Sequence, residues 1–139
     1  MRLGIMQPYF FPYLGHYSLI ASVDQWIVFD VSQYTPRSWM NRNRVLHPSS
    51  GWQYLIVPLS NSSRSIKTYA VRIKNLQETR VAIVRKLEHY KKHAPYYQNV
   101  IDLIGSCFDS DVGDSLVKLN INSLRVVCDY LGIPFCYQI

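Results

Sequence analysis

Short apolar runs alternate with polar, proline-rich segments in the first half of the chain, and apolar stripes at helical spacing fill the second half. Residues 2–6 form an apolar run that ends at Gln7-Pro8, and residues 25–29 (QWIVF) form a second run rich in β-forming side chains. Between them, residues 14–22 have the apolar spacing of a short helix. Two buried strands joined by a helix are usually parallel, so this pattern predicts a βαβ-like unit.

The middle of the chain has the pattern of a β-hairpin. Residues 39–46 can form a strand or an extended loop, and residues 52–59 (WQYLIVPL) have the composition of a strand. Ser49-Ser50-Gly51 lies between them and is a turn signal, so the two segments are expected to pair. Residues 69–73 alternate in polarity and predict a further strand.

The first clear helix is expected to begin at Asn75. Asn75 and Glu78 have the spacing of a capping box, and Pro95 sets the limit of the helix. Its predicted apolar stripe comprises Val81, Ile83, Val84 and Leu87.

The rest of the chain predicts two more helices and a strand. Residues 96–108 form the next helix, and a third, capped by Ser110 or Asp111, ends at Gly132. Residues 133–137 begin one more strand. We therefore predict one α/β domain over residues 1–139, with a mainly parallel sheet, an N-terminal βαβ-like unit, a central hairpin and a helical second half.

Composition places the chain among folded globular proteins. Apolar residues make up 48% and charged residues 17% of its 139 residues, and no apolar run is long enough to span a bilayer. Gln7 and Pro8 interrupt any N-terminal secretory pattern, so we expect a cytoplasmic protein. The three cysteines, Cys107, Cys128 and Cys136, are an odd number without CxxC spacing, which indicates buried thiols in a reduced compartment.

The net charge of +6 is unevenly distributed. Between Val31 and Gln77 there are seven basic residues and no acidic residue. This imbalance predicts an anionic small-molecule ligand, such as a phosphate, nucleotide or carboxylate, and its alternative is a solvated basic face. Nucleic acid is disfavoured, because the chain has no RRM, KH or helix-turn-helix pattern and its basic residues do not alternate with stacking aromatics along the sequence.

Polar residues with possible chemistry follow the two predicted parallel strands. Gln7 comes after the first strand, and Asp30 and Gln33 come after the second, where open α/β sheets place ligands. The two glutamines could recognise polar groups of a ligand. Asp30 could bind a hydroxyl, an ammonium group or a metal, or could instead cap the loop or pair with an arginine. His16 begins the first helix after a glycine, where an imidazole can contact a phosphate, or can simply hydrogen-bond to the loop.

Two arginines in the predicted hairpin favour an anion site. If residues 39–46 are extended, alternation places Arg42 and Arg44 on one face and Asn41 and Asn43 on the other. Two guanidinium groups on one face suit bidentate contacts with phosphate or carboxylate, whereas the alternative is a solvated charge pair.

Several common catalytic patterns are missing from the sequence. It contains no P-loop, GxGxxG or GxSxG motif. His89 and His93 have i, i+4 spacing but lack an obvious third zinc ligand, so we predict a surface face and no metal site. The sequence names no cofactor and leaves the oligomeric state open.

Three blocks of sequence resemble a known family. They are MQPYFFPYLGHYSLI at 6–20, VDQWIVFDVSQY at 23–34 and SWMNRNRV at 38–45. Their order and spacing closely resemble the signature of the WbqC-like family, which comprises bacterial proteins often associated with gene clusters for O-antigen and other surface polysaccharides. LIVPL at 55–59 and LGI at 131–133 are also similar, so the resemblance covers essentially the whole chain.

The resemblance implies an enzyme of surface-polysaccharide biosynthesis, a transferase that moves an acyl or aminoacyl group to a nucleotide-linked sugar. Arg42 and Arg44 would hold an anionic group, and His16 or Asp30 would be the acid/base residue. The residues expected to shape the pocket are Gln7, Tyr9, Gln33, Trp39 and Asn43. The alternative is a non-catalytic binding or assembly factor in the same pathway, with the same ligand.

The sequence departs from the family pattern at three points. Val31 stands where the family usually has a second acidic residue after Asp30, which argues against a metal site built from two carboxylates. The position of His16 is often aromatic in the family. Family members are commonly longer, so we expect the chain to lack the C-terminal part of the family domain.

Overall fold

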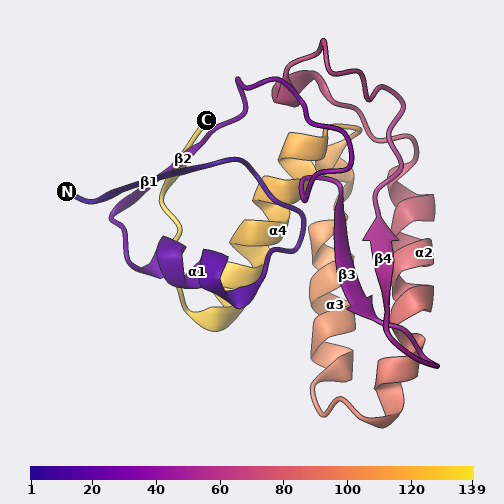
Figure 1. Cartoon of the computed structure of the whole chain (residues 1–139). Helices are drawn as coiled ribbons and strands as arrows, with labels where there is room; N and C mark the ends of the chain where they lie inside the picture. The colour runs from indigo at the N-terminus through magenta and orange to yellow at the C-terminus, as the bar shows by residue number, and fades with distance from the viewer.

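The first strand, helix and second strand form the parallel βαβ unit that the sequence predicts. In the computed structural model, which describes residues 1–139, β1 (Leu3–Met6) and β2 (Gln25–Val28) pair in parallel and are joined by α1 (Leu14–Ala21). The C-terminal strand β5 (Tyr137–Gln138) pairs in parallel with the other side of β2. The sheet therefore has the order β1-β2-β5, with the first and last strands of the chain on either side of β2 (Figure 1).

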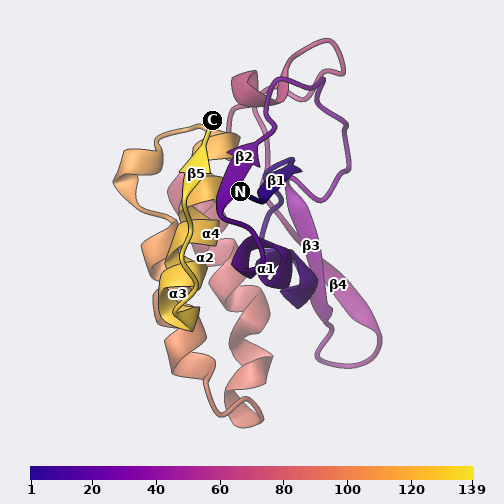
Figure 2. The ribbon, with the colours of Figure 1, turned by 90° about the vertical axis from the view of Figure 1, so that its left-hand side faces the viewer.

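The predicted hairpin is present as a separate two-stranded antiparallel sheet. β3 (Arg42–Leu46) pairs with β4 (Trp52–Ile56), with Arg44 opposite Tyr54 and Leu46 opposite Trp52. Figure 2 shows the hairpin on one side of the molecule and the long helices on the other.

The second half of the chain is helical, as predicted. Its elements are η1 (Thr68–Ala70), α2 (Leu76–Leu87), η2 (Glu88–Lys92), α3 (Tyr97–Cys107), η3 (Ser110–Val112) and α4 (Leu116–Leu131). Asn75 caps α2 by accepting a hydrogen bond from the Glu78 amide at 3.0 Å, and Gly132 (φ 69°) ends α4. The cap of α4 is Ser115 instead of Ser110 or Asp111, because η3 and the turn at Gly113 (φ 61°) precede the helix.

Two sequence-based predictions about local structure are wrong. Residues 69–73 do not form a strand, because they meet loop segments and make only isolated bridges, Leu59 with Ile73 and Arg72 with Ser115. Val81 is 57% exposed, since the buried stripe of α2 passes through Thr79, Ile83 and Leu87.

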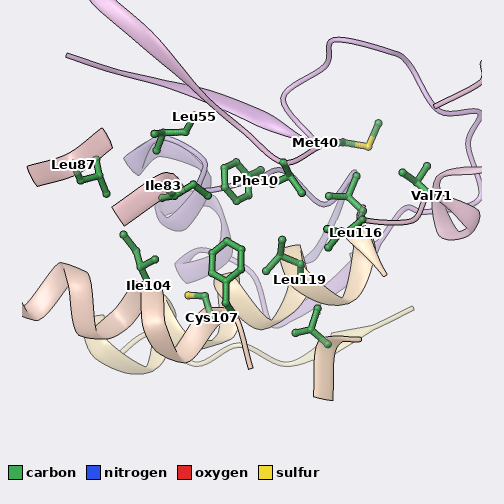
Figure 3. Close-up of a cluster of buried hydrophobic side chains, with 14 of the residues drawn as sticks. Phe10, Met40, Leu55, Val71, Ile83, Leu87, Ile104, Cys107, Leu116 and Leu119 are labelled. Atoms are coloured by element: carbon green, nitrogen blue, oxygen red, sulfur yellow. The ribbon is translucent and has the colours of Figure 1, made fainter. Parts of the chain in front are cut away.

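Helix α4 separates two hydrophobic cores. Leu116 and Leu119 belong to a 15-residue cluster between the hairpin, α2 and α3, and Figure 3 shows them in the same cluster as Phe10 and Ile83. Residues of α4 also contribute to an eight-residue cluster with α1 and β2; they are Val117, Ile121, Leu124 and Cys128. A helix that is apolar on two sides fits this central position, because each side is covered by a different layer.

The parallel sheet is covered on one face. Trp26 and Val28 point into the smaller core and are buried, whereas Leu3, Ile5 and Phe29 are 52%, 59% and 43% exposed. The expectation of two fully buried strands is therefore wrong for the outer face. The physical reason is the strand order: β1, β2 and β5 follow one another in one direction, so right-handed crossovers put α1 and α4 on the same side.

Cys107 and Cys128 are buried, as predicted, whereas the prediction is wrong for Cys136, which is exposed in the C-terminal segment. Burial raises the pKa of both the Cys107 and the Cys128 thiols to about 11, so both are protonated at neutral pH. No helix combines the length and the apolar composition that crossing a bilayer requires.

Gly4 is expected to be needed for the contact between β1 and Trp26. A Cβ at this position would lie 2.6 Å from Cε3 and 2.8 Å from Cζ3 of the buried indole. We expect Gly4→Ala to lower the free energy of unfolding by about 2 kcal/mol in urea titrations, because the core has no room for the added methyl group. Gly105→Ala is the control: its Cβ would meet only the flexible end of Arg80, and it should stabilise α3. Equal stability of Gly4→Ala and the unmodified chain would contradict this role.

Candidate functional site

An arginine-rich platform covers one face of the hairpin. The Arg42 Cζ lies 4.5 Å from the ring centroid of Tyr54 and 5.9 Å from that of Trp39. The Arg44 Cζ lies 4.9 Å from the Trp52 centroid and 5.3 Å from that of Trp39. We call these five residues the arginine platform. It arises because alternation along β3 puts both arginines on one face, and the register of β4 places two aromatic rings beside them.

The guanidinium groups of the platform have no protein acceptor. The three ion pairs of the protein are Arg2–Asp24, Arg72–Asp114 and Arg125–Asp129, and neither Arg42 nor Arg44 donates a side-chain hydrogen bond. The Nε atom of Arg42 is buried and has no partner. Stacking on an aromatic ring uses the face of a guanidinium group and leaves its N–H donors free at the edge. Unpaired guanidinium groups of this kind are chemically suited to a phosphate or a carboxylate.

A first cavity, of about 250 Å³, adjoins Arg44. Its lining includes three of the residues that the sequence predicts for the pocket, Tyr9, Trp39 and Asn43, together with Tyr13. Tyr13 is 77% exposed and stands at the N-terminus of α1. An anion held by Arg44 could extend from the platform into this cavity.

A second cavity, of about 410 Å³, adjoins Arg42. Arg37 also lines it and brings a third unpaired guanidinium group to this region. The Tyr34 hydroxyl donates to Oδ1 of Asn41 at 3.1 Å. Burial raises the pKa of Tyr34, an effect that the nearby Arg42 opposes, so the hydroxyl is neutral at pH 7. The second cavity is thus also positive.

Two asparagines fix the loops that carry the platform. The Asn43 side chain donates to the carbonyl oxygens of Phe10, at 3.2 Å, and Phe11, at 2.6 Å. Asn120 of α4 is fully buried and donates to the carbonyl oxygens of Pro8 and Met40, both at 2.8 Å. Asn43 is therefore occupied by the fold, and its amide is not available to a ligand. Asn43 thus holds the N-terminal loop against β3, and Asn120 holds the same loop and the segment before β3 against α4.

The loops contain two residues with unusual backbone angles. Phe11 has φ 39° and Arg37 has φ 60°. Neither residue is a glycine, although positive φ angles favour glycine. Phe11 departs from extended backbone although Pro8 and Pro12 flank residues 9–11, and its carbonyl accepts a hydrogen bond from Asn43. Such strained residues persist where the surrounding structure holds them, and they occur often at binding sites.

A different group of predicted residues lies at the carboxyl ends of β1 and β2. The Gln7 side chain donates to Oγ of Ser32 at 2.9 Å, and that hydroxyl lies 3.4 Å from Oγ1 of Thr68. Asp30 is 8% exposed and its carboxylate has no hydrogen-bond or ion-pair partner. Gln33 is exposed, and its backbone pairs with that of Lys67 in an isolated antiparallel β-bridge. None of these residues lines either cavity at the platform.

His16 is enclosed behind the first cavity. It is 2% exposed, and neither ring nitrogen has a hydrogen-bond partner. Its ring lies among aromatic neighbours, with centroid distances of 5.8 Å to Tyr9, 6.4 Å to Tyr17 and 5.2 Å to Trp26. Burial lowers the pKa of His16 below its ordinary value of 6.5, because the charged form loses its hydration. The histidine is therefore neutral at pH 7 and out of contact with solvent.

We expect His16 to make the fold sensitive to acid. Below about pH 6.5 the unfolded chain binds a proton that the folded chain does not, so stability falls with decreasing pH until the lowered folded pKa is reached. The slope contributed by this group is at most about 1.4 kcal/mol per pH unit. His16→Phe should remove this contribution, as measured by urea unfolding between about pH 7 and 5. His93→Phe, at an exposed histidine, should leave it in place. Parallel pH profiles for His16→Phe and the unmodified chain would exclude this role.

The structure thus divides the predicted site residues into three places. Tyr9, Trp39, Arg42, Asn43 and Arg44 meet at the platform; Gln7, Asp30 and Gln33 follow the parallel strands; His16 is buried.

Sequence reasoning missed Tyr13, Tyr34, Arg37, Trp52, Tyr54 and Asn120. Trp52 and Tyr54 could have been predicted, since the predicted hairpin turn places an alternating W-x-Y strand opposite the arginines. The sequence signal for Asn120 is weaker: it is an amide between two apolar residues of a predicted helix.

No group of three or more His, Cys, Asp or Glu side chains is arranged to hold a metal ion.

Comparisons with known proteins give a family and one curated relative. Residues 7–139 match the family described as "WbqC-like protein family". A protein of Mycobacterium tuberculosis, "Uncharacterized protein Rv1507c", is 31% identical over 132 residues. The match covers 95% of the chain described above but 57% of that relative's length. No solved structure matches the chain significantly.

Proposed function

The chain belongs to the WbqC-like protein family, and from this premise we propose that it takes part in bacterial surface-polysaccharide (O-antigen) biosynthesis and binds a nucleotide-linked sugar on the arginine platform. We further propose that it is a transferase that moves an acyl or aminoacyl group to this sugar. Such a transfer forms an ester or amide bond to a sugar hydroxyl or amine and releases the leaving group of the donor. The proposal includes a cytoplasmic location.

One observation carries the proposal: two guanidinium groups without a protein acceptor are stacked on three aromatic rings. A nucleotide-linked sugar has a diphosphate between two groups that can stack. Arg42 and Arg44 suit the diphosphate, because guanidinium groups make bidentate, charge-assisted hydrogen bonds to phosphate oxygens. Trp39 and Trp52, which are 39% and 52% exposed, offer ring faces for the base or the sugar.

Asp30 is the acid/base group that we favour within the transferase proposal. Asp30 is 8% exposed and its carboxylate makes no hydrogen bond or ion pair. Both ring nitrogens of His16 are buried without a partner, so we favour Asp30 for proton transfer. Gln7 follows β1, and Asp30 and Gln33 follow β2. We propose that the two glutamines orient the group to be transferred.

A second candidate is a non-catalytic binding or assembly factor that uses the same ligand. It is favoured by a specific observation: the linings of the two platform cavities include neither Asp30 nor His16. The chain also spans 57% of the length of the curated relative. A catalytic activity of the longer protein is therefore a proposal for this chain.

Calorimetric titration with a UDP-linked sugar tests binding, with the uncharged sugar and inorganic pyrophosphate as comparisons. We expect the nucleotide-linked sugar to bind and the uncharged sugar not to bind, because the guanidinium groups need an anion. Stronger binding of a single-stranded oligonucleotide with steep salt dependence would contradict the proposal. Mass spectrometry of the recovered ligand in the presence of acyl donors separates the candidates: an enzyme yields acylated sugar, whereas a binding factor returns it unchanged.

A further inference from the structure

A long apolar groove runs from the hairpin to the helices. Its largest part, about 520 Å³, is lined by side chains of the hairpin, the N-terminal loop, α3 and the end of α4. The side chains that form its floor and walls are Val45, Leu55, Leu87, Leu103, Ile104 and Val127. The groove has the size and apolar lining of ligand pockets, which are typically about 300–1,000 Å³.

The groove continues beyond this part. A neighbouring cavity of about 310 Å³ lies between β3, η2 and the start of α3, and eight of its nine lining residues are hydrophobic. The two cavities share Val45, Leu87 and Val100, so they form one elongated apolar depression. An elongated shape of this kind fits a chain more closely than a ring.

Side chains along the groove are exposed although they are apolar. Val100 of α3 is 45% exposed, and Tyr130 and Leu131 at the end of α4 are 52% and 46% exposed. Val100 and Leu131 are exposed because they line a groove that no other segment of the chain fills. A ligand that covered them would remove apolar surface from water.

One end of the groove opens at the arginine platform. Tyr13, Asn43 and Arg44 line both the groove and the first cavity. The Arg44 guanidinium group has no carboxylate partner and stacks on Trp39 and Trp52. The apolar groove therefore ends at an unpaired positive charge. This arrangement is complementary to a molecule with an aliphatic chain and an anionic head group.

We propose that the groove binds the aliphatic chain of an anionic amphiphile, with its head group at Arg44. The head-group half of this inference rests on the anion site of the proposed function. If the protein is a transferase, the donor it accepts is then a fatty-acyl donor, because an aminoacyl group would leave most of the groove empty. The free amphiphile and a membrane lipid share this chemistry, and the test separates them.

Titration with butyl, hexyl, octyl and decyl phosphate below their micellar concentrations tests the groove. Each added methylene should increase the affinity about three- to fourfold, because burying a methylene is worth about 0.8 kcal/mol. Octanol, which lacks the anion, should bind more weakly than octyl phosphate. Affinity that does not depend on chain length would overturn the proposal, and so would binding to phosphatidylglycerol vesicles without binding of octyl phosphate.

Two matched variants locate the chain. Val100→Glu should weaken decyl phosphate binding at least tenfold, because the new carboxylate lies in the groove. Both Val100 and the control, Val81→Glu, are exposed helical valines, and Val81 lines none of these cavities, so the control should bind normally. Equal effects of the two variants would overturn the proposal. A change in sedimentation coefficient caused by Val100→Glu without a change in decyl phosphate binding would instead make the groove an interface between copies.

The same titrations separate this inference from the proposed function. Binding of the UDP-linked sugar without a chain-length effect would overturn the groove and leave the proposed function standing. A chain-length effect without binding of the UDP-linked sugar would support the groove and overturn the proposed ligand. Inorganic pyrophosphate reports the anion site alone, and Val100→Glu should leave its binding within about twofold.

Discussion

Replacing Arg42 and Arg44 together by alanine should reduce the affinity for a UDP-linked sugar by at least about a hundredfold. Each guanidinium group would lose charge-assisted hydrogen bonds worth about 1.5–3 kcal/mol, which corresponds to about 10- to 150-fold per arginine. The two arginines share Trp39 as a neighbour, so their effects need not add. Titration calorimetry of both single variants and the double variant measures the individual and combined losses.

The fold should tolerate these changes. Neither arginine forms an ion pair, and the loss of a stacking contact near the surface costs about 0.5–1 kcal/mol of stability. Arg44→Lys keeps the charge and removes the planar donor set, so it should recover part of the affinity. Arg64→Ala, at an exposed residue of the loop 61–65, is the control and should bind as the unmodified chain does. If the double variant bound the sugar nucleotide normally, the platform would not be its site.

Removing the side-chain amide of Asn120 should cause the largest loss of stability among the polar residues. Asn120→Leu keeps the approximate volume but leaves the carbonyl oxygens of Pro8 and Met40 buried without donors. The expected loss is about 2–4 kcal/mol in the free energy of unfolding, since each buried unpaired group costs about 1–3 kcal/mol. Asn120→Asp should cost more, because a carboxylate would face two carbonyl oxygens inside the core.

Hydrogen exchange can show that Asn120 holds the loops of the site. The Phe10 amide donates to the Trp39 carbonyl at 2.8 Å, next to both acceptors of Asn120. In Asn120→Leu, this amide should exchange faster than amides in the centre of α4, because the two loops lose their common attachment. Asn99→Leu, at an exposed asparagine of α3, is the control and should change neither stability nor exchange. Uniformly faster exchange would mean that Asn120 supports the whole core and not these loops.

Local signals in the sequence predicted the order and type of most elements. The βαβ unit followed from two apolar runs around a short helical stripe, and it is present with parallel strands. The hairpin followed from the turn signal at 49–51, and the capping by Asn75 from its spacing to Glu78. These features depend on neighbours in the chain, and local backbone chemistry decides them. The prediction of a strand at 69–73 was wrong because pairing depends on a partner strand that the local pattern does not reveal.

By itself, the sequence determined that Arg42 and Arg44 share a face, because alternation along a strand is a local property. It also determined that these arginines have no acidic neighbour in the sequence, because residues 31–77 contain neither Asp nor Glu. The predicted hairpin already placed Trp52 and Tyr54 opposite the arginines. Only the tertiary structure decided that Trp39, from the loop before β3, lies beside both guanidinium groups. The same holds for Asn120, which meets Pro8 across 112 residues of chain. It holds for His16 as well, because burial is a property of the packed core and is not written in the neighbouring residues.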